Sequence, residues 1–395
     1  MNLRDYKTVS DRRKALEKEL SVNLNLIGSY SLDESVASKR NCENMIGAAQ
    51  IPMGVAGPLL IKSQISNPEN LKKKNYYIPL ATTEGALVAS INRGCKAITL
   101  SGGAVVDSHR IGATRGPVFR VKNLAENRTL RTFFDTRFDE LKAIAAKTSH
   151  HLALTSFTST CIGRYRYVRF VFDTQDAMGL NMVTIATEAV ASYIQEQTGI
   201  ECLALSGNYC VDKKPSWLNI LGKRGIKVWA EVVLTQKVLK ETLKTSAQQL
   251  YDVWLAKCML GSVMSGSMAF NAQFANVVAA LFAATGQDIA HVVEGSLGVT
   301  TAEVLPGGAL YMCVYVPDLM IGTVGGGTGL ATQHEALTLL GVAGSSPEGE
   351  SGNNARRFAE IVGAAVLAGE ISLLSSLEEG SLARAHQKFG RGKQL

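Results

Sequence analysis

The chain has 395 residues, which is more than one ordinary hydrophobic core requires and favours two or three domains. Its 46% hydrophobic and 19% charged residues are typical of a globular enzyme and exclude a disordered or fibrous chain. The formal net charge of +7 suits a small polyanionic ligand. The basic residues do not form a stripe with interleaved aromatic side chains, so we expect no nucleic-acid partner.

The first 42 residues are predicted to form a small helical domain, with Ser10 or Asp11 as the cap of a helix. Beyond them the composition becomes rich in Gly, Ala and small polar residues. There the segment ATTEGALVASINRGCKAI predicts a loop that leads into a second helix, with Thr82 or Thr83 as its cap.

Residues 117–205 differ in character from the Gly- and Ala-rich sequence on both sides. Strands are predicted at 118–122 and 165–172, where β-branched and aromatic residues are dense, and helices at 133–147 and 178–198. This alternation is typical of a small α+β unit of the split-βαβ type. Because the Gly- and Ala-rich texture resumes afterwards, the unit is predicted to be inserted rather than appended.

The remainder of the chain predicts mainly buried helix, at 250–285, 330–340 and 361–377, with a polar loop at 345–354. The longest apolar stretches within it are shorter than the ~20 residues that span a membrane, and the N-terminus MNLRDYK is not a signal peptide. The seven scattered cysteines include no CxxC pair, which argues against disulfides or a zinc site. We therefore expect a cytoplasmic protein with no membrane partner and no metal.

The usual phosphate-binding patterns GxGxxG and Walker A are absent, as are HExxH and GxSxG. Two other segments could hold an anion on backbone N–H groups: DAMGLNM (176–182), which starts a helix after a strand, and GTVGGGT (322–328), which precedes another helix. Each could equally be a structural turn.

Several charged residues lie in apolar or polar-loop surroundings that suit chemistry. Glu84 lies in ATTEGA, and Asp288 follows a long uncharged run. Lys213 and Lys214 lie in the polar loop SGNYCVDKKP, which suits an anion or carbonyl site. The alternatives are helix capping for the carboxylates and a solvated turn for the lysines. His291, three residues after Asp288, indicates a local helix pair.

Taken together, these segments resemble class I 3-hydroxy-3-methylglutaryl-CoA (HMG-CoA) reductase from about Glu43 to His386. The matching motifs, in the order of the family, are ENMIG…IPMGVAGPL, ATTEGALVASINRGCKAI, TRGP, DAMGLNM, SGNYCVDKKP, GQD, GTVGGGT and the terminal histidine segment. The resemblance implies an α+β fold of three parts. They are a helical N-terminal domain (1–42), a large family-specific α/β domain (43–116 and 206–395), and an inserted ferredoxin-like, non-Rossmann NADP-binding domain (117–205).

The family reduces HMG-CoA to mevalonate and CoA in two hydride transfers from NADPH, through mevaldehyde. By the resemblance, Lys213 stabilises the tetrahedral oxyanion, and His386 protonates the CoA thiolate. Glu84 would be the acid of the second reduction, and Asp288 would tune both Lys213 and Glu84 within one charge cluster.

The resemblance also assigns binding residues. Those matched to the substrate are Arg93, Arg115, Ser206, Asn208, Asp212, Lys214, Lys257 and Asn276. Those matched to the cofactor are Asp176, Met178, Gly179, Asn181, Met182, Gly325, Gly326, Gly327 and Thr328. Thr136 and Arg137 match the position that meets the adenosine 2′-phosphate, and an arginine there favours NADPH over NADH.

The resemblance further implies a homodimer, or a dimer of dimers, with active sites shared between subunits. Gln273 departs from a histidine that is frequent in the family. Two rival functions stay open. One is an NAD-dependent degradative reductase that works in the oxidative direction, and the other is a lyase in which Lys213 forms a Schiff base.

Overall fold

The structure is a computed structural model that describes residues 5–63, 65, 72–222 and 224–380. It is a mixed α/β protein with a large sheet of ten strands. These are β1 (Met53–Ser63), β2 (Lys72–Ala81), β3 (Ala104–Arg115), β4 (Val118–Arg120), β5 (Ala153–Ile162), β6 (Tyr165–Asp173), β7 (Glu201–Ala204), β8 (Gly225–Leu234), β9 (Val299–Leu305) and β10 (Ala309–Leu319). Their order is β7-β4-β6-β3-β8-β10-β9, with β1 beside β2 and β3, and β5 beside β6. All of these pairs are antiparallel except β1 with β3.

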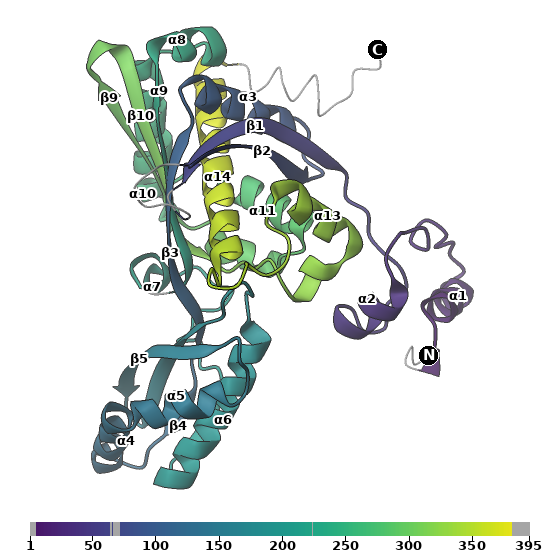
Figure 1. Ribbon diagram of the computed structural model, residues 1–395, viewed down its shortest axis with the longest axis vertical. Coiled ribbons are helices and arrows are strands. Elements are labelled where there is room, and N and C mark those ends of the chain that lie inside the picture. The colour runs from purple at the N-terminus through teal and green to yellow at the C-terminus, as the bar shows by residue number, and fades with distance from the viewer. Residues whose placement is uncertain (1–4, 64, 66–71, 223, 381–395) are drawn as a thin grey trace.

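Helices cover this sheet and extend from it on the N-terminal side (Figure 1). The α-helices are α1 (Val9–Leu20), α2 (Glu34–Arg40), α3 (Leu87–Leu100), α4 (Leu124–Thr136), α5 (Phe138–Ala146), α6 (Leu180–Thr198), α7 (Trp217–Leu221), α8 (Gln236–Val238), α9 (Ala247–Trp254), α10 (Ser262–Ser265), α11 (Phe274–Thr285), α12 (Val292–Gly295), α13 (Ala331–Leu340) and α14 (Asn353–Glu379). Shorter π or 3₁₀ turns are η2 (Leu239–Leu243), η3 (Leu255–Gly261), η4 (Ile289–His291), η5 (Pro306–Gly308) and η6 (Gly326–Gly329).

The long strand β3 joins two separate hydrophobic cores. Its first part pairs with β8 in the larger core, and its last three residues, Ala113–Arg115, pair with β6 in the smaller core. Gly112 lies where the strand changes partner, with a φ of 119°. A Cβ at this position would come within 2.4 Å of the Phe172 carbonyl oxygen. Glycine is therefore required here, because any side chain would separate β3 from β6.

The smaller core is built from aromatic side chains of β4–β6 and apolar faces of α4–α6. Phe119, Phe134, Phe170 and Phe172 are fully buried in it, and Phe134 packs edge-on against both Phe119 and Phe170. Such aromatic pairs contribute about 0.5–1.5 kcal/mol each beyond the burial of their area. Figure 1 shows this part of the chain below the larger core.

The larger core surrounds α14, which passes through the centre of that part of the molecule (Figure 1). This helix is long and apolar enough to cross a membrane, but 94% of its most apolar window is buried among other elements, as in a core helix. It approaches α3 so closely that a Cβ at Gly94 would lie 1.9 Å from the Ala368 carbonyl oxygen. Gly94 thus sets the distance between the two helices.

A buried carboxylate on α14 fixes the start of α11. Glu370 is fully buried, and it accepts hydrogen bonds from the backbone N–H groups of Ala272 (2.8 Å) and Gln273 (2.7 Å) and from the Thr300 hydroxyl (2.6 Å). Burial raises the pKa of Glu370, and these three donors oppose that effect. Gln273, the N-cap residue of α11, makes no side-chain cap of its own. The first helical N–H, that of Phe274, donates to the Asn271 Oδ1 at 3.2 Å, and Glu370 holds the two residues that precede the helix.

Some local predictions were wrong at helix starts. Thr8, rather than Ser10 or Asp11, caps α1, because its extended backbone lets its hydroxyl accept from the Asp11 N–H at 3.0 Å. Neither Thr82 nor Thr83 caps α3. The left-handed conformation of Ala86 (φ 75°) stops that helix from extending backwards.

Other predictions were wrong in length. The helix expected at 133–147 is two helices, α4 and α5, which meet at Arg137, whose backbone is not helical (φ −118°, ψ 19°). The continuous helix expected at 250–285 is interrupted after Gly266, which adopts a left-handed conformation. The predicted helices at 330–340 and 361–377 are confirmed by α13 and α14, and the strand β5 was not predicted.

Gly94→Ala is expected to destabilise the fold by about 1–3 kcal/mol, because the added methyl group overlaps the α14 backbone. The free energy of unfolding measured in urea would show this loss. Gly329→Ala is a suitable control, because a Cβ at Gly329 meets nothing within 4 Å. Equal stability of the two variants would mean that α3 and α14 are not held at this distance.

Candidate active site

A cavity of about 1290 Å³ lies where the two cores meet. Three segments, called loops below, form its walls: 176–182, which leads into the first turn of α6, 286–288 after α11, and 322–328, which runs into η6 before α13. Residues of the polar loop between α13 and α14 line a further side. The two glycine-containing segments that the sequence indicated as anion sites therefore border one space.

The three loops touch through their backbones. The Thr323 N–H donates to the Asp176 carbonyl at 2.8 Å, and a Cβ at Gly322 would lie 2.5 Å from the Met178 nitrogen. A Cβ at Gly286 would likewise lie 2.2 Å from the Gly327 carbonyl oxygen. Gln287 adds two hydrogen bonds to the backbone of Gly322. Glycine at these positions allows the backbones to approach closely, which fixes the cavity wall.

Two parts of this wall can bind an anion. The helix α6 begins after Gly179, a left-handed residue with no side-chain cap, so the first N–H groups of the helix have no capping side chain. Gly325 and Gly326 both have positive φ, and a Cβ at either would meet nothing within 4 Å. The open space beside this backbone leaves room for a ligand to approach it closely.

Asp176 lines the cavity, but its carboxylate already binds protein groups. It accepts hydrogen bonds from the Ser346 N–H (2.7 Å) and hydroxyl (3.0 Å), and from the N–H groups of Gly352 (3.2 Å) and Ala355 (3.0 Å). Asp176 is only 4% exposed. It therefore caps α14 and connects the loop between α13 and α14 to the loop at 176–182.

An ion pair lies at the edge of the cavity. The Lys213 Nζ is 2.7 Å from the Asp288 Oδ2, and both side chains are about one-third exposed. Burial alone would raise the pKa of Asp288, but the hydrogen bond from Lys213, the Ala290 N–H and the nearby charges of His291 and Lys213 lower it. Asp288 is therefore ionised at neutral pH.

The loop that carries Lys213 has a strained backbone. Asn208, Val211 and Lys213 all have positive φ, between 53° and 63°, although none is glycine. Such conformations cost on the order of 1–3 kcal/mol each and persist only where surrounding contacts hold them. The strain places Lys213 where its side chain reaches Asp288.

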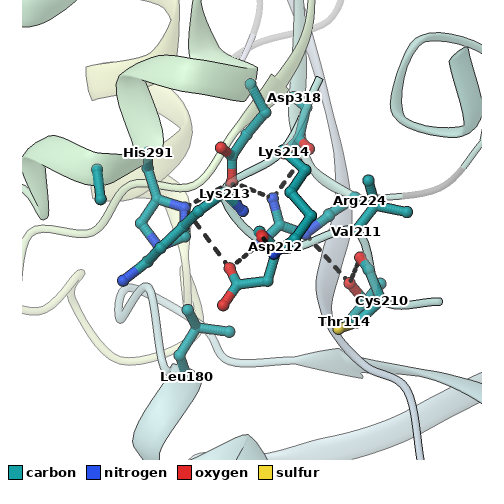
Figure 2. Close-up of polar contacts among 12 residues, drawn as sticks. Thr114, Leu180, Cys210, Val211, Asp212, Lys213, Lys214, Arg224, His291 and Asp318 are labelled. Carbon is teal, nitrogen blue, oxygen red and sulfur yellow. Dashed lines mark hydrogen bonds and ion pairs between the residues drawn. The ribbon is translucent and has the colours of Figure 1, made fainter. Parts of the chain in front are cut away.

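The contacts that hold the Lys213 loop come from a buried charge cluster. We define this cluster as Asp212, Arg224, His291, Glu294 and Asp318. Figure 2 shows Arg224, His291 and Asp318 around the loop of Asp212 and Lys213. Arg224 is fully buried and donates to Glu294 (2.6 Å), Asp212 (2.7 Å) and Asp318 (3.0 Å). Burial alone would lower the pKa of Arg224, but the three carboxylates raise it further than burial lowers it. The guanidinium stays charged.

Three ligand-type residues of this cluster, Asp212, His291 and Glu294, have atoms within 4.8 Å of one another. Their arrangement resembles a metal site. The Arg224 guanidinium, however, binds both carboxylates and already supplies the positive charge that a metal ion would bring. The cluster therefore fits a structural ion network better than a metal centre.

The residues that were matched by resemblance do not all meet at this cavity. Those that line it are Arg115, Asp176, Met178, Gly179, Asn181, Met182, Asp212, Lys213, Asp288, Gly325, Gly326, Gly327 and Thr328. Ser206, Asn208 and Lys214 lie on the Lys213 loop without lining it. Thr136 and Arg137 lie at the junction of α4 and α5, where Arg137 pairs with Glu140. His386 lies outside the described residues.

A second group lies elsewhere on the larger core: Glu84, Arg93, Lys257 and Asn276. The expectation that Glu84 joins Lys213 and Asp288 in one cluster stays a prediction, since Glu84 does not line the cavity of its own chain. Glu84 is exposed between β2 and α3, and its N–H donates to the Thr82 hydroxyl. Arg93 binds the α14 side chains Ser372 and Glu379.

The cluster also contains residues that the sequence did not indicate, namely Arg224, Glu294 and Asp318. His291 was interpreted as a local helix partner of Asp288, which is incomplete. The ring is fully buried, and its Nδ1 lies 2.6 Å from the Glu294 Oε1 while its Nε2 lies 3.6 Å from Asp288. A buried histidine between two carboxylates is a functional-site signal that spacing alone did not reveal.

A large cavity walled by glycine-rich backbone beside an ion-paired lysine is typical of an enzyme that binds a large anionic molecule. The model of the family hydroxymethylglutaryl-coenzyme A reductase matches residues 8–391 of this chain. The chain therefore belongs to the hydroxymethylglutaryl-coenzyme A reductase family.

Individual relatives agree with this assignment. The 3-hydroxy-3-methylglutaryl-coenzyme A reductase of Methanocaldococcus jannaschii is 49% identical over 386 residues, which cover 96% of this chain and 92% of the relative. That of Pyrococcus horikoshii is 48% identical over 382 residues, or 96% and 91% of the two chains. The structure of the NADPH-bound class II enzyme from Streptococcus pneumoniae has a TM-score of 0.69 and 18% identity, with coverage of 94% and 97%. That last likeness establishes the fold alone.

Asp176→Asn is expected to loosen the loop between α13 and α14, because the amide turns an N–H donor toward N–H groups. A loss of about 1–3 kcal/mol in unfolding free energy is expected, together with faster amide hydrogen exchange at Gly352 and Ala355. Asp139→Asn is the control, since the Asp139 side chain is 95% exposed and pairs with Lys142 on α5. Unchanged exchange at both amides would contradict the role of Asp176.

Proposed function

We propose that this chain is a class I HMG-CoA reductase that reduces (S)-HMG-CoA to (R)-mevalonate and CoA in the mevalonate pathway, at the expense of two NADPH. The observation that carries the proposal is the Lys213–Asp288 ion pair at the edge of a cavity bordered by two glycine loops. The class I label is supported by 49% identity to the Methanocaldococcus jannaschii enzyme, against 18% to the class II structure.

The residues around the cavity fit a dinucleotide phosphate. The start of α6 and the backbone of Gly325 and Gly326 offer N–H groups to pyrophosphate without a Rossmann fingerprint. We therefore place NADPH binding on the part of the chain from 117 to 205 together with loop 322–328, as an inserted ferredoxin-like domain docked on a large domain. When bound, NADPH supplies the hydride for each of the two reductions.

The chain's own residues would then act on the substrate. Lys213, held by Asp288, would donate a hydrogen bond to the oxyanion that forms at the thioester carbon. His386 is proposed to protonate the departing CoA thiolate, and Glu84 to protonate the alkoxide of the second reduction. Arg115 lines the same cavity and would pair with the anionic end of a ligand.

Glu84 is not among the residues that line the cavity, and this supports a site shared between two copies of the chain. Glu84, Lys257 and Asn276 do not line the cavity of their own chain. We propose that a homodimer brings this group against the Lys213–Asp288 pair of the partner, so that each active site contains residues of both subunits.

The Schiff-base alternative is disfavoured by the Lys213 environment. An amine that attacks a carbonyl needs a free lone pair, whereas the Lys213 ammonium is held at 2.7 Å by an ionised carboxylate in surroundings rich in negative charge. Reduction with borohydride in the presence of substrate is therefore expected to leave Lys213 unmodified.

The purified chain is expected to consume two NADPH for each CoA released from HMG-CoA, measured from NADPH absorbance together with a thiol reagent. Lys213→Met should lower kcat by at least about 10²-fold, because the oxyanion loses its cation. Lys240→Met, on the short helix η2, is a matched control. One NADPH per CoA, or a preference for NADH in the reverse direction, would overturn the proposal.

Mixing two inactive variants tests the shared site. Co-expressed Glu84→Gln and Lys213→Met chains should regain about one quarter of wild-type activity, because half of randomly formed dimers are mixed and each has one intact site. Differently tagged chains allow the mixed dimer to be isolated and assayed. If the mixed dimer stays as inactive as its parents, both residues act within one chain.

A further inference from the structure

Arg40 lines the large cavity, yet neither the sequence motifs nor the matched residues gave it a role. It lies in the last turn of α2, and both Arg40 and the following Asn41 border the cavity. Its side chain is exposed, and its guanidinium makes no ion pair or hydrogen bond with the other described residues. Glu348, an exposed carboxylate of the same cavity, does not pair with it. The charge of Arg40 is therefore available to a ligand.

A small apolar cluster sets the position of α2 beside the glycine loop. Ala37 of α2 is 3% exposed and forms this cluster with Val9 and Met45, and Leu330 packs against it. Leu330 directly follows η6 (Gly326–Gly329) and lines the cavity itself. Figure 1 shows α2 next to α13, whose first turn follows Leu330. The N-terminal part of the chain is thus docked next to the glycine loop of the cavity wall.

The direction of the Arg40 side chain follows from its place on α2. Arg40 comes three residues after Ala37, and residues at this spacing project from the same side of a helix. Ala37 faces the cluster against which Leu330 packs, so Arg40 extends from that side into the cavity. Arg12 holds the segment after α2 in place, because its Nε donates to the Met45 carbonyl at 2.8 Å.

The three permanent cations among the described residues that line the cavity differ in what they contact. The Lys213 ammonium is neutralised by Asp288 at 2.7 Å. Arg115 donates to the Thr184 hydroxyl at 2.6 Å, and it is already proposed to pair with the anionic end of a ligand. Arg40 alone of the three has no partner in the described part of the chain. It is therefore the available cation beside the glycine loop.

We propose that Arg40 binds the pyrophosphate of the dinucleotide that lies against the backbone of Gly325 and Gly326. This inference rests on the proposed function and adds a residue of α2 to the cofactor site. The N–H groups of the glycine loop and of the α6 start carry only partial positive charge, whereas pyrophosphate is a dianion. A guanidinium supplies a full charge and can donate to two phosphate oxygens at once.

Binding of NADPH and of NADH to the full chain, measured by calorimetric titration without HMG-CoA, tests this role. The two dinucleotides share the pyrophosphate and differ in the 2′-phosphate. Arg40→Gln is expected to weaken the binding of both by the same factor, about 10-fold or more. Lys39→Gln is the matched control, because it removes the same charge from the same turn at a residue that does not line the cavity. Thermal melting of each variant verifies folding.

The outcomes separate this inference from the proposed function. Unchanged affinity of Arg40→Gln for both dinucleotides overturns the role of Arg40 and leaves the function intact. A loss confined to NADPH also overturns it, because Arg40 would then contact the 2′-phosphate. A wild-type chain that binds neither dinucleotide overturns the proposed function, and the role of Arg40 with it.

Amide hydrogen exchange in α2 distinguishes a direct contact from a merely structural arginine. The N–H groups of Asn41 and Cys42 both donate to the Ala37 carbonyl at 3.0 Å. Because Arg40 would connect α2 to the bound cofactor, saturating NADPH is expected to slow exchange at these two amides in the wild type and in Lys39→Gln. In Arg40→Gln, NADPH should leave the exchange rates unchanged. Equal protection of the amides in Arg40→Gln contradicts the proposed contact.

Discussion

The fully buried guanidinium of Arg224 is the constraint on which the site depends. A cation removed from water is tolerated only where anions surround it, and here Asp212, Glu294 and Asp318 do so from three separate segments. Asp212 lies in the loop before α7, Glu294 in α12 and Asp318 in β10. The need to neutralise one charge thus holds together a loop, a helix and a strand that are far apart in the sequence.

The same constraint stabilises a strained backbone. A left-handed Lys213 would relax into an ordinary conformation if its loop were free. The hydrogen bond from its N–H to Glu294, and the neighbouring Asp212–Arg224 ion pair, prevent this. The contacts of the buried cluster therefore fix the orientation of the Lys213 ammonium group. The cavity wall is held by a different kind of contact. Its three loops pack backbone against backbone at glycine positions.

The sequence predicted the candidate residues better than their arrangement. Asp288 was indicated because it follows a long uncharged run, and Lys213 because it lies in a polar loop, while their roles came from the family resemblance. Both residues line the cavity. Arg224 was missed because it precedes Gly225 in what looks like an ordinary basic turn. Its three carboxylate partners are distant in the chain, and periodicity carries no information about such pairing. Helix existence was predicted well, but helix starts depended on single backbone conformations such as that of Ala86.

The separation of the matched residues into two groups follows from where the chain places its charges. Lys213 and Asp288 neutralise each other at the cavity, and Glu294 and Arg224 neutralise each other in the buried charge cluster. A further carboxylate from the same chain would add to an already negative cluster before any ligand is present. Glu84, exposed at the start of α3, adds no charge to the cluster of its own chain. An acid contributed by a second subunit would meet the Lys213–Asp288 pair only in the assembled dimer. The complete acid–base set would then form only when two chains associate.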